Sequence, residues 1–290
     1  MLAYRISASP PHVELREVEE PVPSPNETLV RVRAFSLNRG EVLDLAARAD
    51  GAAVGWDFAG VATTGERVVG VVRGGAWAEL VAVPASQLAV VPDGVSDAEA
   101  ATLPTAGLTA LRSLELGGFL LGKRVLVTGA RGGVGGYAVQ LAALGGASVT
   151  ALVRNVETSV PGAARVIDRI ADEFDLVVDA VGGETFAAAI EHVAPGGLVV
   201  NLATGSPDEV VSFRAARFDR APGARIYTLN LFDELPRMDA AKSLGRLADL
   251  LAQRRLTAPV ALEAPWQELD HAIDTLLNRW IGGKAVLHVG

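Results

Sequence analysis

The sequence predicts an α/β protein made of a β-rich domain and a domain in which strands alternate with helices. In residues 1–100, short runs of β-branched residues are separated by Gly and Pro, which is typical of a twisted or barrel-like sheet. From residue 124 on, short apolar runs alternate with helical segments. Nearly continuous apolarity indicates strands that are buried on both faces, as in a parallel sheet covered by helices.

Bulk properties agree with two domains and exclude several classes of function. The chain has 290 residues, of which 50% are hydrophobic and 21% charged, so it can bury a sizeable core and is not composed like a disordered protein. Its net charge of −8 argues against binding to nucleic acid or anionic lipid. Without cysteine it has no disulfide, thiolate zinc site or cysteine nucleophile. Neither a signal peptide nor a membrane span is recognised, so we expect a cytoplasmic protein without membrane contact.

Strands and helices of the first part follow from local patterns. The predicted strands are TLVRVRAFSLN (28–38), GERVVGVV (65–72) and AWAELVAVP (76–84). A short helix is expected around Glu41–Arg48. A second helical segment, residues 96–114, opens with Ser96 and has Glu99 three residues later, which is the capping-box pattern.

In the second part, five apolar runs are predicted strands. They are residues 124–128, 148–152, 165–168, 176–180 and 198–203. Between the first two, small and apolar residues from Ala138 to Gly145 recur at i, i+3, i+4 and i+7, so the stretch VLVTGARGGVGG (125–136) leads into a helix. Between the second and third, Pro161 and Gly162 predict an interrupted helix.

The end of the chain returns to a different kind of unit. A helix is predicted near Asp239–Gln253, and a strand follows in TAPVALEAP. The next helix has one apolar face, made of Leu269, Ala272, Ile273, Leu276, Leu277 and Trp280. KAVLHV (284–289) closes the chain as a strand. This tail fits the first domain better than the alternating sheet, so we expect one domain of residues 1–108 and 254–290 and another of residues 109–253.

The glycine-rich turn is predicted to hold the phosphates of a nucleotide. Gly132 lets the backbone approach a pyrophosphate, and Gly135 lets the helix pack close to the strand. The N-terminus of the helix offers free N–H groups and partial positive charge to the phosphates. Glycine-rich turns also occur in sheets that bind nothing. Here the order strand, turn, helix, strand favours nucleotide binding.

Taken alone, the turn fits two dehydrogenase superfamilies. Read from Thr128 it is T-G-x-x-x-G-x-G, as in short-chain dehydrogenases, and read from Ala130 it is A-x-G-x-x-G, as in zinc-free medium-chain dehydrogenases. Short-chain dehydrogenases begin with this turn and carry Tyr-x-x-x-Lys. In this chain residues 1–124 come before the stretch VLVTGARGGVGG that contains the turn. No tyrosine and lysine in the chain have the Tyr-x-x-x-Lys spacing. The short-chain interpretation therefore fails.

The chain resembles the zinc-free quinone oxidoreductase and enoyl reductase branch of the medium-chain dehydrogenase/reductase superfamily. The resemblance covers essentially the whole chain and rests on SLNRGEV (36–42), GWDFAGV (55–61), GAWAELVAVP (75–84), LPTAGLTAL (103–111), VLVTGARGGVGGYAVQLA (125–142), DAVGGETF (179–186), APGGLVV (194–200) and GKAVL (283–287). It implies a GroES-like β-barrel catalytic domain and a Rossmann domain with a doubly wound parallel sheet. It also implies an active site in the cleft between them and a homodimer.

The second strand of the nucleotide half predicts which nucleotide binds. In a Rossmann half, an acid about 20 residues past the glycines takes the ribose hydroxyls. Val153 holds that position here, and Arg154 follows, which suits a 2′-phosphate, so NADP(H) is the expected cofactor. An ordinary solvated arginine is the alternative. The predicted cofactor-binding residues are Thr109, Ala130, Arg131, Gly132, Gly133, Val134, Arg154, Val181, Ala203 and Thr204.

No metal site is expected. Zinc-dependent relatives place a histidine in G-H-E and a cysteine earlier, whereas this chain has Trp56 and Asn38 near those positions. Asn38 is a catalytic candidate that would hydrogen-bond the substrate carbonyl or the nicotinamide, and Glu41 is one because relatives carry an acid there. The alternatives are a turn residue and a charge at a helix N-terminus. No tyrosine follows within SLNRGEVLDL, so the proton donor is unassigned.

These observations favour an NADPH-dependent reductase of a small-molecule quinone or enone. Without a Lewis acid, hydride addition to an already polarised acceptor is easier than alcohol oxidation. One alternative is an enoyl-thioester reductase of the fatty-acid or polyketide type. Another is a sensor or scaffold protein that binds NADP(H) without catalysis.

Overall fold

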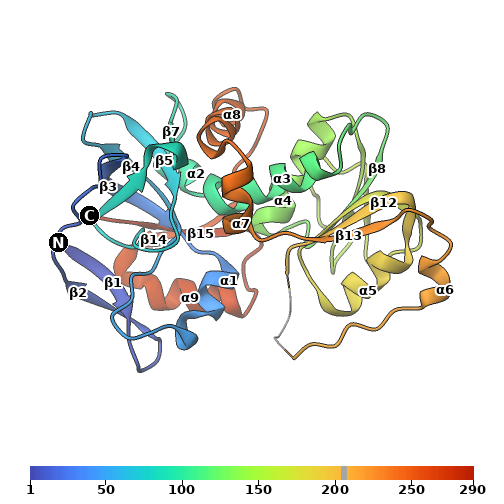
Figure 1. The fold of residues 1–290 in the computed structure, drawn as a ribbon, viewed down its shortest axis with the longest axis horizontal. Helices are drawn as coiled ribbons and strands as arrows, with labels where there is room; N and C mark the ends of the chain where they lie inside the picture. The colour runs from blue at the N-terminus through green and yellow to red at the C-terminus, as the bar shows by residue number, and fades with distance from the viewer. Residues whose placement is uncertain (204–207) are drawn as a thin grey trace. The chain divides into compact units, whose positions relative to one another are not determined.

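A computed structural model of the chain describes residues 1–203 and 208–290, which form two compact units (Figure 1). Unit 1 consists of Met1–Leu108 and Leu235–Gly290, and unit 2 is Thr109–Glu234. The predicted boundary after residue 253 differs from this one. Helix α8 (Ala240–Ala252) packs on β5 (Arg67–Val71) and β7 (Leu88–Val90), so it belongs to unit 1.

Unit 1 is built on a mixed sheet. Its strand order is β14 (Val260–Pro265), β15 (Lys284–His288), β3 (Glu27–Ser36), β4 (Asp57–Ala62), β5 and β7, with β6 (Leu80–Pro84) paired to β3. β1 (Leu2–Ile6) and β2 (Val13–Glu17) form a separate antiparallel hairpin. β15 runs antiparallel to β3, with Val286 opposite Ser36, so the last strand of the chain lies in the sheet of unit 1.

The helices of unit 1 are short apart from α8. They are α1 (Arg39–Leu43), α2 (Asp97–Ala101), α9 (Leu269–Leu277), a π-helical turn η3 (Leu103–Gly107), and single 3₁₀ turns η1 (Leu45–Ala47), η2 (Ala85–Gln87), η4 (Leu235–Arg237) and η5 (Trp266–Glu268). The predicted capping box is confirmed: Ser96 Oγ accepts from the N–H of Glu99 at 3.1 Å, and Glu99 Oε2 accepts from the N–H of Ser96 at 2.8 Å. Trp280 was expected on the apolar face of α9 but lies beyond its end and is 71% exposed.

The core of unit 1 holds β3, β4 and β15 in place. Phe35 stacks on Trp77 with ring centroids 5.7 Å apart, and both side chains are buried. Phe58 from β4 and Leu269 from α9 complete the same cluster. Burial of such side chains contributes about 1.5–3 kcal/mol each. The residues at the ends of these strands are therefore carried on a well-packed frame.

Unit 2 contains a six-stranded sheet in which every neighbouring pair is parallel. The order is β10 (Arg165–Ile167), β9 (Ser148–Leu152), β8 (Arg124–Thr128), β11 (Phe174–Asp179), β12 (Val193–Asn201) and β13 (Arg225–Thr228). In chain order this is 3-2-1-4-5-6, the doubly wound arrangement. The strand order reverses direction between β8 and β11, so their carboxyl ends mark the ligand-binding edge.

The connections of unit 2 are helices in most places. They are α3 (Leu108–Leu116), α4 (Gly133–Leu144), α5 (Gly183–Glu191), α6 (Ala215–Phe218) and α7 (Leu231–Glu234). Five strands match the predicted apolar runs, whereas β13 was not predicted. Residues 155–164 join β9 to β10 through turns without a helix, as Pro161 and Gly162 indicate.

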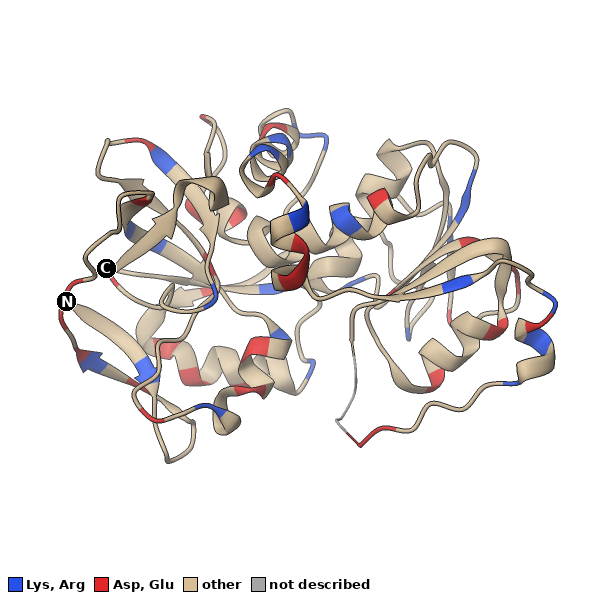
Figure 2. Ribbon diagram, in the orientation of Figure 1, with Lys and Arg blue, Asp and Glu red and all other residues tan. Residues whose placement is uncertain are grey.

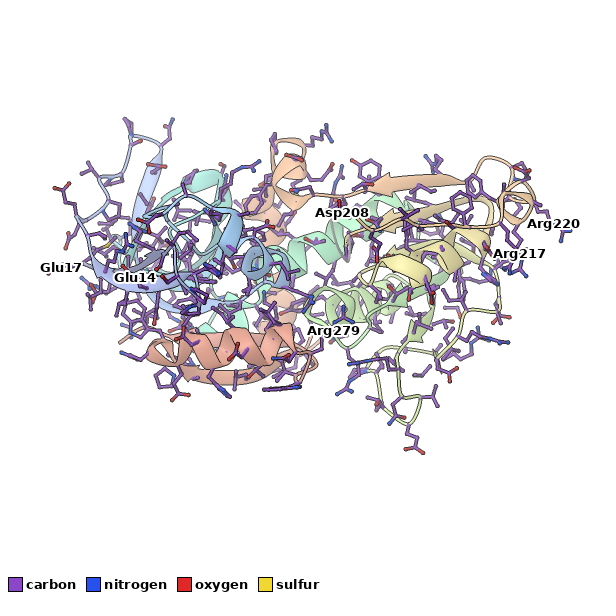
Figure 3. All side chains as sticks on the ribbon, turned by 90° about the horizontal axis from the view of Figure 1, so that it is seen from below. Glu14, Glu17, Asp208, Arg217, Arg220 and Arg279 are labelled. Atoms are coloured by element: carbon purple, nitrogen blue, oxygen red, sulfur yellow. The ribbon has the colours of Figure 1, made fainter. Side chains whose placement is uncertain are left out.

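Charged side chains of both signs are interspersed along the ribbon (Figure 2). In unit 2, Glu191 at the end of α5 pairs with Arg214 and Arg217, each at 3.2 Å. Arg217 and the nearby Arg220 are labelled beside α6 in Figure 3. Among the described residues, no helix has both the length and the apolar character needed to cross a membrane.

Candidate active site

The glycine turn follows β8 at the carboxyl edge of the parallel sheet. Gly129 adopts a φ of 59°, and the N–H of Gly132 donates to its carbonyl at 2.8 Å. A Cβ on Gly135 would overlap the same carbonyl group, so only glycine lets α4 pack this close to the turn. No side chain caps the N-terminus of α4. The first N–H groups of the helix are therefore available to a phosphate, and the turn fits a dinucleotide.

Four further predicted cofactor residues lie in or directly after this turn. Ala130 is buried, whereas Arg131 is exposed. Gly133 and Val134 form the first turn of α4 and are partly exposed. The structure thus brings these residues together around the predicted pyrophosphate position. Their contact with a cofactor stays a prediction.

The other predicted cofactor residues of unit 2 come from separate connections. Val181 follows β11 and packs on the turn, since a Cβ placed on Gly129 would lie 3.3 Å from Val181 Cγ2. Ala203 follows β12, and its carbonyl accepts from Asn201 Nδ2 at 3.1 Å. Thr109 lies buried at the start of α3. Thr204 lies outside the described residues.

Arg154 lies just past the carboxyl end of β9. Val153 is buried, and its N–H donates to the carbonyl of Ile167 on β10 at 2.9 Å, which fixes the backbone where the strand ends. Arg154 itself is exposed. Within residues 1–203 and 208–290, no acidic side chain pairs with it. An arginine with no acidic partner among these residues is available to an anion.

Asp179, which the sequence analysis did not single out, connects the ends of three strands. Its Oδ1 accepts from Thr128 Oγ1 at 2.5 Å, and its Oδ2 accepts from the N–H of Gly182 at 3.0 Å and Asn201 Nδ2 at 3.4 Å. The side chain is fully buried, and burial raises the pKa of Asp179 above its usual value although these hydrogen bonds act to lower it. The carboxylate therefore positions the loops after β8, β11 and β12.

Unit 1 contains a second polar centre, around the buried carboxylate of Asp57. Its Oδ2 accepts from Ser36 Oγ at 3.1 Å and Asn38 Nδ2 at 2.9 Å. Its Oδ1 accepts from the N–H of Thr105 at 2.9 Å and from the hydroxyl of the same residue at 2.5 Å. Lys284 Nζ lies 3.1 Å from Oδ2, so an ion pair is buried inside the unit. β4 begins at Asp57, and all of these side-chain partners lie outside β4.

Lys284 also contacts the predicted catalytic residue Asn38. Its Nζ donates to Asn38 Oδ1 at 2.5 Å. The contact arises because β15, which begins at Lys284, pairs with β3, and β3 ends two residues before Asn38. Asp57 and Lys284 lie within the motifs GWDFAGV and GKAVL, but nothing local in the sequence indicated that they meet.

Glu41, the other predicted catalytic residue, is fully buried in α1. Neither of its carboxylate oxygens has a hydrogen-bond partner among the described residues. Burial and the charge of Asp57 raise the pKa of Glu41 well above its usual value, and nearby Lys284 and Asn38 oppose the shift only in part. The carboxyl group is buried away from solvent, so it is not exposed to a ligand in this structure. A catalytic role for Glu41 stays a prediction.

The side chains described here offer no cluster of three or more His, Cys, Asp or Glu with the geometry of a metal site. Trp56, which stands where zinc-dependent relatives have a histidine, is partly buried. The candidate residues therefore fall into two sets, each described by itself: the glycine turn with Arg154 in unit 2, and Asn38 with its charged neighbours in unit 1.

Comparison with known proteins places this arrangement in a family. A sequence model described as "Zinc-binding dehydrogenase" matches residues 151–287. The chloroplast envelope quinone oxidoreductase homolog of Arabidopsis thaliana is 35% identical over 234 residues, which cover 66% of this chain and 71% of that protein. The chain belongs to the medium-chain dehydrogenase/reductase superfamily. Within that superfamily it falls in the quinone oxidoreductase and enoyl reductase branch, as its motifs predicted.

Other members of the superfamily match the whole chain. The chloroplastic quinone-oxidoreductase homolog of Spinacia oleracea is 28% identical over 94% of this chain and 93% of that protein. The phthioceranic/hydroxyphthioceranic acid synthase of Mycobacterium tuberculosis is 29% identical over 96% of this chain, which spans only 15% of that protein.

Solved structures of the superfamily share the fold. The quinone oxidoreductase of Thermus thermophilus, solved alone and with NADPH, has a TM-score of 0.82 and 27% identity, covering 99% of this chain and 100% of that one. The predicted combination of a GroES-like β-barrel domain and a Rossmann domain is confirmed. The homodimer expected from the superfamily stays a prediction.

Proposed function

We propose that this chain is an NADPH-dependent reductase that transfers hydride, without a metal ion, to quinones or α,β-unsaturated carbonyl compounds. The observation that carries the proposal is the glycine turn of a 3-2-1-4-5-6 sheet together with Arg154 at the end of β9. The turn supplies N–H groups at the N-terminus of α4 to a pyrophosphate. Arg154 supplies a cation directly after Val153, which stands where NAD-dependent Rossmann domains have an acid.

The preference for NADPH over NADH follows from charge. Arg154 can form charge-assisted hydrogen bonds with a 2′-phosphate, and Val153 leaves no carboxylate to repel it. The similar quinone oxidoreductase of Thermus thermophilus was solved with NADPH, which supports the same nucleotide here. Bound NADPH would supply the hydride, which is two electrons and one hydrogen nucleus.

The acceptor class follows from what the chain offers the substrate. When hydride adds to the β-carbon of an enone, the electron pair moves toward the carbonyl oxygen, and the α-carbon then takes a proton from water. Asn38 offers an amide N–H to that oxygen, as a donor does in an oxyanion hole. With no cysteine in the chain and tryptophan at position 56, the zinc ligands of metal-dependent relatives are missing. We therefore assign the reaction to metal-free hydride transfer.

A second candidate is an enoyl-thioester reductase. It is favoured by the similarity to the mycobacterial synthase, of which this chain matches one section along 96% of its own length. A thioester carbonyl accepts negative charge as an enone carbonyl does, so the same Asn38 donor would serve. The two candidates differ in the group bonded to the activating carbonyl, which is carbon in a quinone or enone and sulfur in an enoyl thioester.

Titration calorimetry with NADPH and NADH, followed by a panel of quinones, enones and enoyl thioesters, tests the proposal. We expect NADPH to bind at least about tenfold more tightly than NADH, a difference of about 1.4 kcal/mol. NADPH oxidation should accelerate when a quinone or enone is added, and chelators should not change the rate. Turnover restricted to thioesters would select the second candidate. Tight NADPH binding without turnover of any acceptor would instead establish a non-catalytic binding protein.

A further inference from the structure

We propose that Lys284 and Asp57 are positioning residues that hold the carboxamide of Asn38 in one orientation and polarise it toward the substrate. The inference rests on the proposed function, because it concerns the donor assigned there to the substrate oxygen. It goes further by giving a role to the last strand of the chain. Lys284 reaches Asn38 across 246 positions of sequence.

The orientation of Asn38 is set by two opposite charges. Lys284 Nζ lies 2.5 Å from Oδ1, and Asp57 Oδ2 lies 2.9 Å from Nδ2. If the carboxamide turned by 180°, its NH₂ group would face an ammonium group and its oxygen would face a carboxylate. Both contacts would be repulsive in a buried, low-dielectric site, where charges interact strongly. The amide oxygen therefore stays on Lys284 and the NH₂ group on Asp57.

The same contacts make Asn38 a better donor. An ammonium group at Oδ1 draws electron density from the amide, and chains of hydrogen bonds strengthen one another in a protein interior. Asp57 uses one N–H of Nδ2. The buried carboxyl group of Glu41 also lies near the Asn38 side chain, which acts to lower the pKa of Glu41, but neither Glu41 oxygen accepts a hydrogen bond of normal geometry from a described residue. Asn38 is 9% exposed, compared with 4% for Lys284 and 0% for Asp57. Of the three residues, Asn38 is therefore the one placed to contact a ligand.

Fold stability alone does not require Lys284. Asp57 still accepts hydrogen bonds from Ser36, from Asn38 and twice from Thr105 when the lysine is removed. Ser36 donates to Asp57 and to the carbonyl of Ala101 but has no contact with Asn38. A change at Ser36 removes one donor from the same buried carboxylate and keeps both charged partners of the carboxamide, so it measures how much the loss of a donor to Asp57 costs by itself.

The first experiment compares K284M with S36A and with K242M, which changes an exposed lysine. We expect K284M to lower kcat for the preferred acceptor at least about tenfold, with KM for NADPH within threefold of wild type. K242M should keep kcat within about threefold of wild type, and S36A should lower kcat less than K284M even where it lowers stability as much. Equal loss of kcat in S36A and K284M would show a structural role and overturn the inference.

Chemical rescue tests whether the ammonium group itself is needed. K284A leaves a cavity that a small alkylammonium ion can enter, whereas K284M fills it. Ethylammonium or propylammonium should restore kcat of K284A at least about fivefold with saturation, and should not restore K284M. Tetramethylammonium, which has the charge but no N–H group, should have no effect. A different pair of results would also overturn the inference. In that pair, no primary amine restores the kcat lost in K284A, and kcat of K284M equals that of wild type.

A readout without turnover separates this inference from the proposed function. In protein labelled with ¹⁵N-asparagine, the side-chain NH₂ signals of Asn38, assigned by their absence from N38A, should form two sharp peaks in wild type and S36A. In K284M the amide oxygen is no longer polarised by an ammonium group, so rotation about the C–N bond should be faster and exchange between the two peaks should increase. If wild type turns over no acceptor, the proposed function fails while this result still stands. If the peaks are the same in K284M and wild type, the positioning role fails.

Discussion

Thr128 Oγ1 donates a hydrogen bond to Asp179 Oδ1 at 2.5 Å, and this contact joins the carboxyl ends of β8 and β11. These are the two strands between which the order of the parallel sheet reverses. The same hydroxyl accepts from the N–H of Ala180 at 3.0 Å. The glycine turn after β8 and the loop after β11 are therefore held to each other by side chains beneath the site that would receive the nucleotide.

Thr128→Val should lower the free energy of unfolding by about 1–3 kcal/mol, because the buried carboxylate of Asp179 loses a donor. The loss should be larger at pH 8 than at pH 4. Burial raises the pKa of Asp179 above its usual 3.8, so stability falls as pH rises through that folded pKa, and removal of the hydroxyl raises it further. Urea unfolding at both pH values measures the difference.

The matched control for Thr128→Val is Thr150→Val. Thr150 is buried on the neighbouring strand β9, and no described hydrogen bond joins it to a carboxylate. Its replacement should change stability by the same amount at the two pH values. An equal pH dependence in both variants would show that the Thr128–Asp179 contact contributes nothing specific.

The sequence predicted the parallel half better than the mixed half, for a physical reason. Strands buried on both faces are continuous apolar runs, and β8 and β9 were predicted at their observed bounds. β4 was not predicted as a strand, because Asp57 and Gly60 interrupt its apolar run. β1 and β2 were missed as well, since β2 alternates with exposed charges.

The candidate site was predictable only where one continuous segment builds it. The glycine turn and Arg154 each follow directly from a strand and its end, and their contact with a nucleotide stays a prediction. The partners of Asn38 were not predicted, because Lys284 and Asp57 meet across 227 positions through strand pairing that no local pattern encodes. For Glu41, the sequence predicts a catalytic role or, as the alternative, a charge at a helix N-terminus. Tertiary packing instead buries it completely.

Glu41→Gln should make the protein more stable, by an amount that grows with pH. The pKa of Glu41 in the folded protein is raised well above the usual 4.5 by burial and by Asp57. The free energy of unfolding of wild type therefore has its full value below pH 4.5, the usual pKa. It falls as pH rises toward the pKa of Glu41 in the folded protein. Glutamine has no such titration. At pH 8 we expect the free energy of unfolding of the variant to exceed that of wild type by about 1–3 kcal/mol.

Denaturant titrations of wild type and Glu41→Gln at pH 4.5, 6 and 8 check this expectation. Glu115→Gln is the control, since Glu115 is exposed. Its stability curve should run parallel to that of wild type over the whole range. A constant difference between wild type and Glu41→Gln across the three pH values would contradict the raised pKa.

Gly135→Ala should weaken both the fold and nucleotide binding. The new Cβ would overlap the carbonyl of Gly129, so α4 must move away from the turn. Overpacking of this kind costs about 1–3 kcal/mol of stability, and displaced N–H groups no longer converge on a phosphate. NADPH affinity by calorimetry should fall at least about tenfold. Gly245→Ala, in α8, where the new Cβ would make one ordinary contact with Ala89 Cβ at 4.0 Å, should instead be neutral or slightly stabilising.

Removal of metal ions should leave activity unchanged. No described group of side chains has the geometry of a metal site, and the chain has no cysteine to act as a zinc ligand. After dialysis against EDTA and then 1,10-phenanthroline, we expect the rate of NADPH oxidation with quinone to stay within about 20% of the untreated rate. Metal analysis of the active sample completes the measurement. Activity that disappears on chelation and returns with zinc would refute metal-free hydride transfer.

Arg154→Ala should lower the affinity for NADPH about 10- to 100-fold, because charge-assisted hydrogen bonds are worth about 1.5–3 kcal/mol. The affinity for NADH, which lacks the 2′-phosphate, should stay within threefold of wild type. This difference between nucleotides separates a direct contact from a general weakening of the site. Because Arg154 is exposed and pairs with no described acid, its removal should leave the melting temperature unchanged.

Arg165→Ala provides the control for Arg154→Ala. Arg165 is an exposed arginine on the neighbouring strand β10, where it pairs with Asp172. Its replacement removes the same unit of charge from the neighbouring strand, so any long-range electrostatic effect on NADPH should appear in both variants and weaken with salt. A direct contact with the 2′-phosphate should appear in Arg154→Ala alone. Equal losses of NADPH affinity in the two variants would show that Arg154 contributes only general positive charge, and the nucleotide preference would then need another origin.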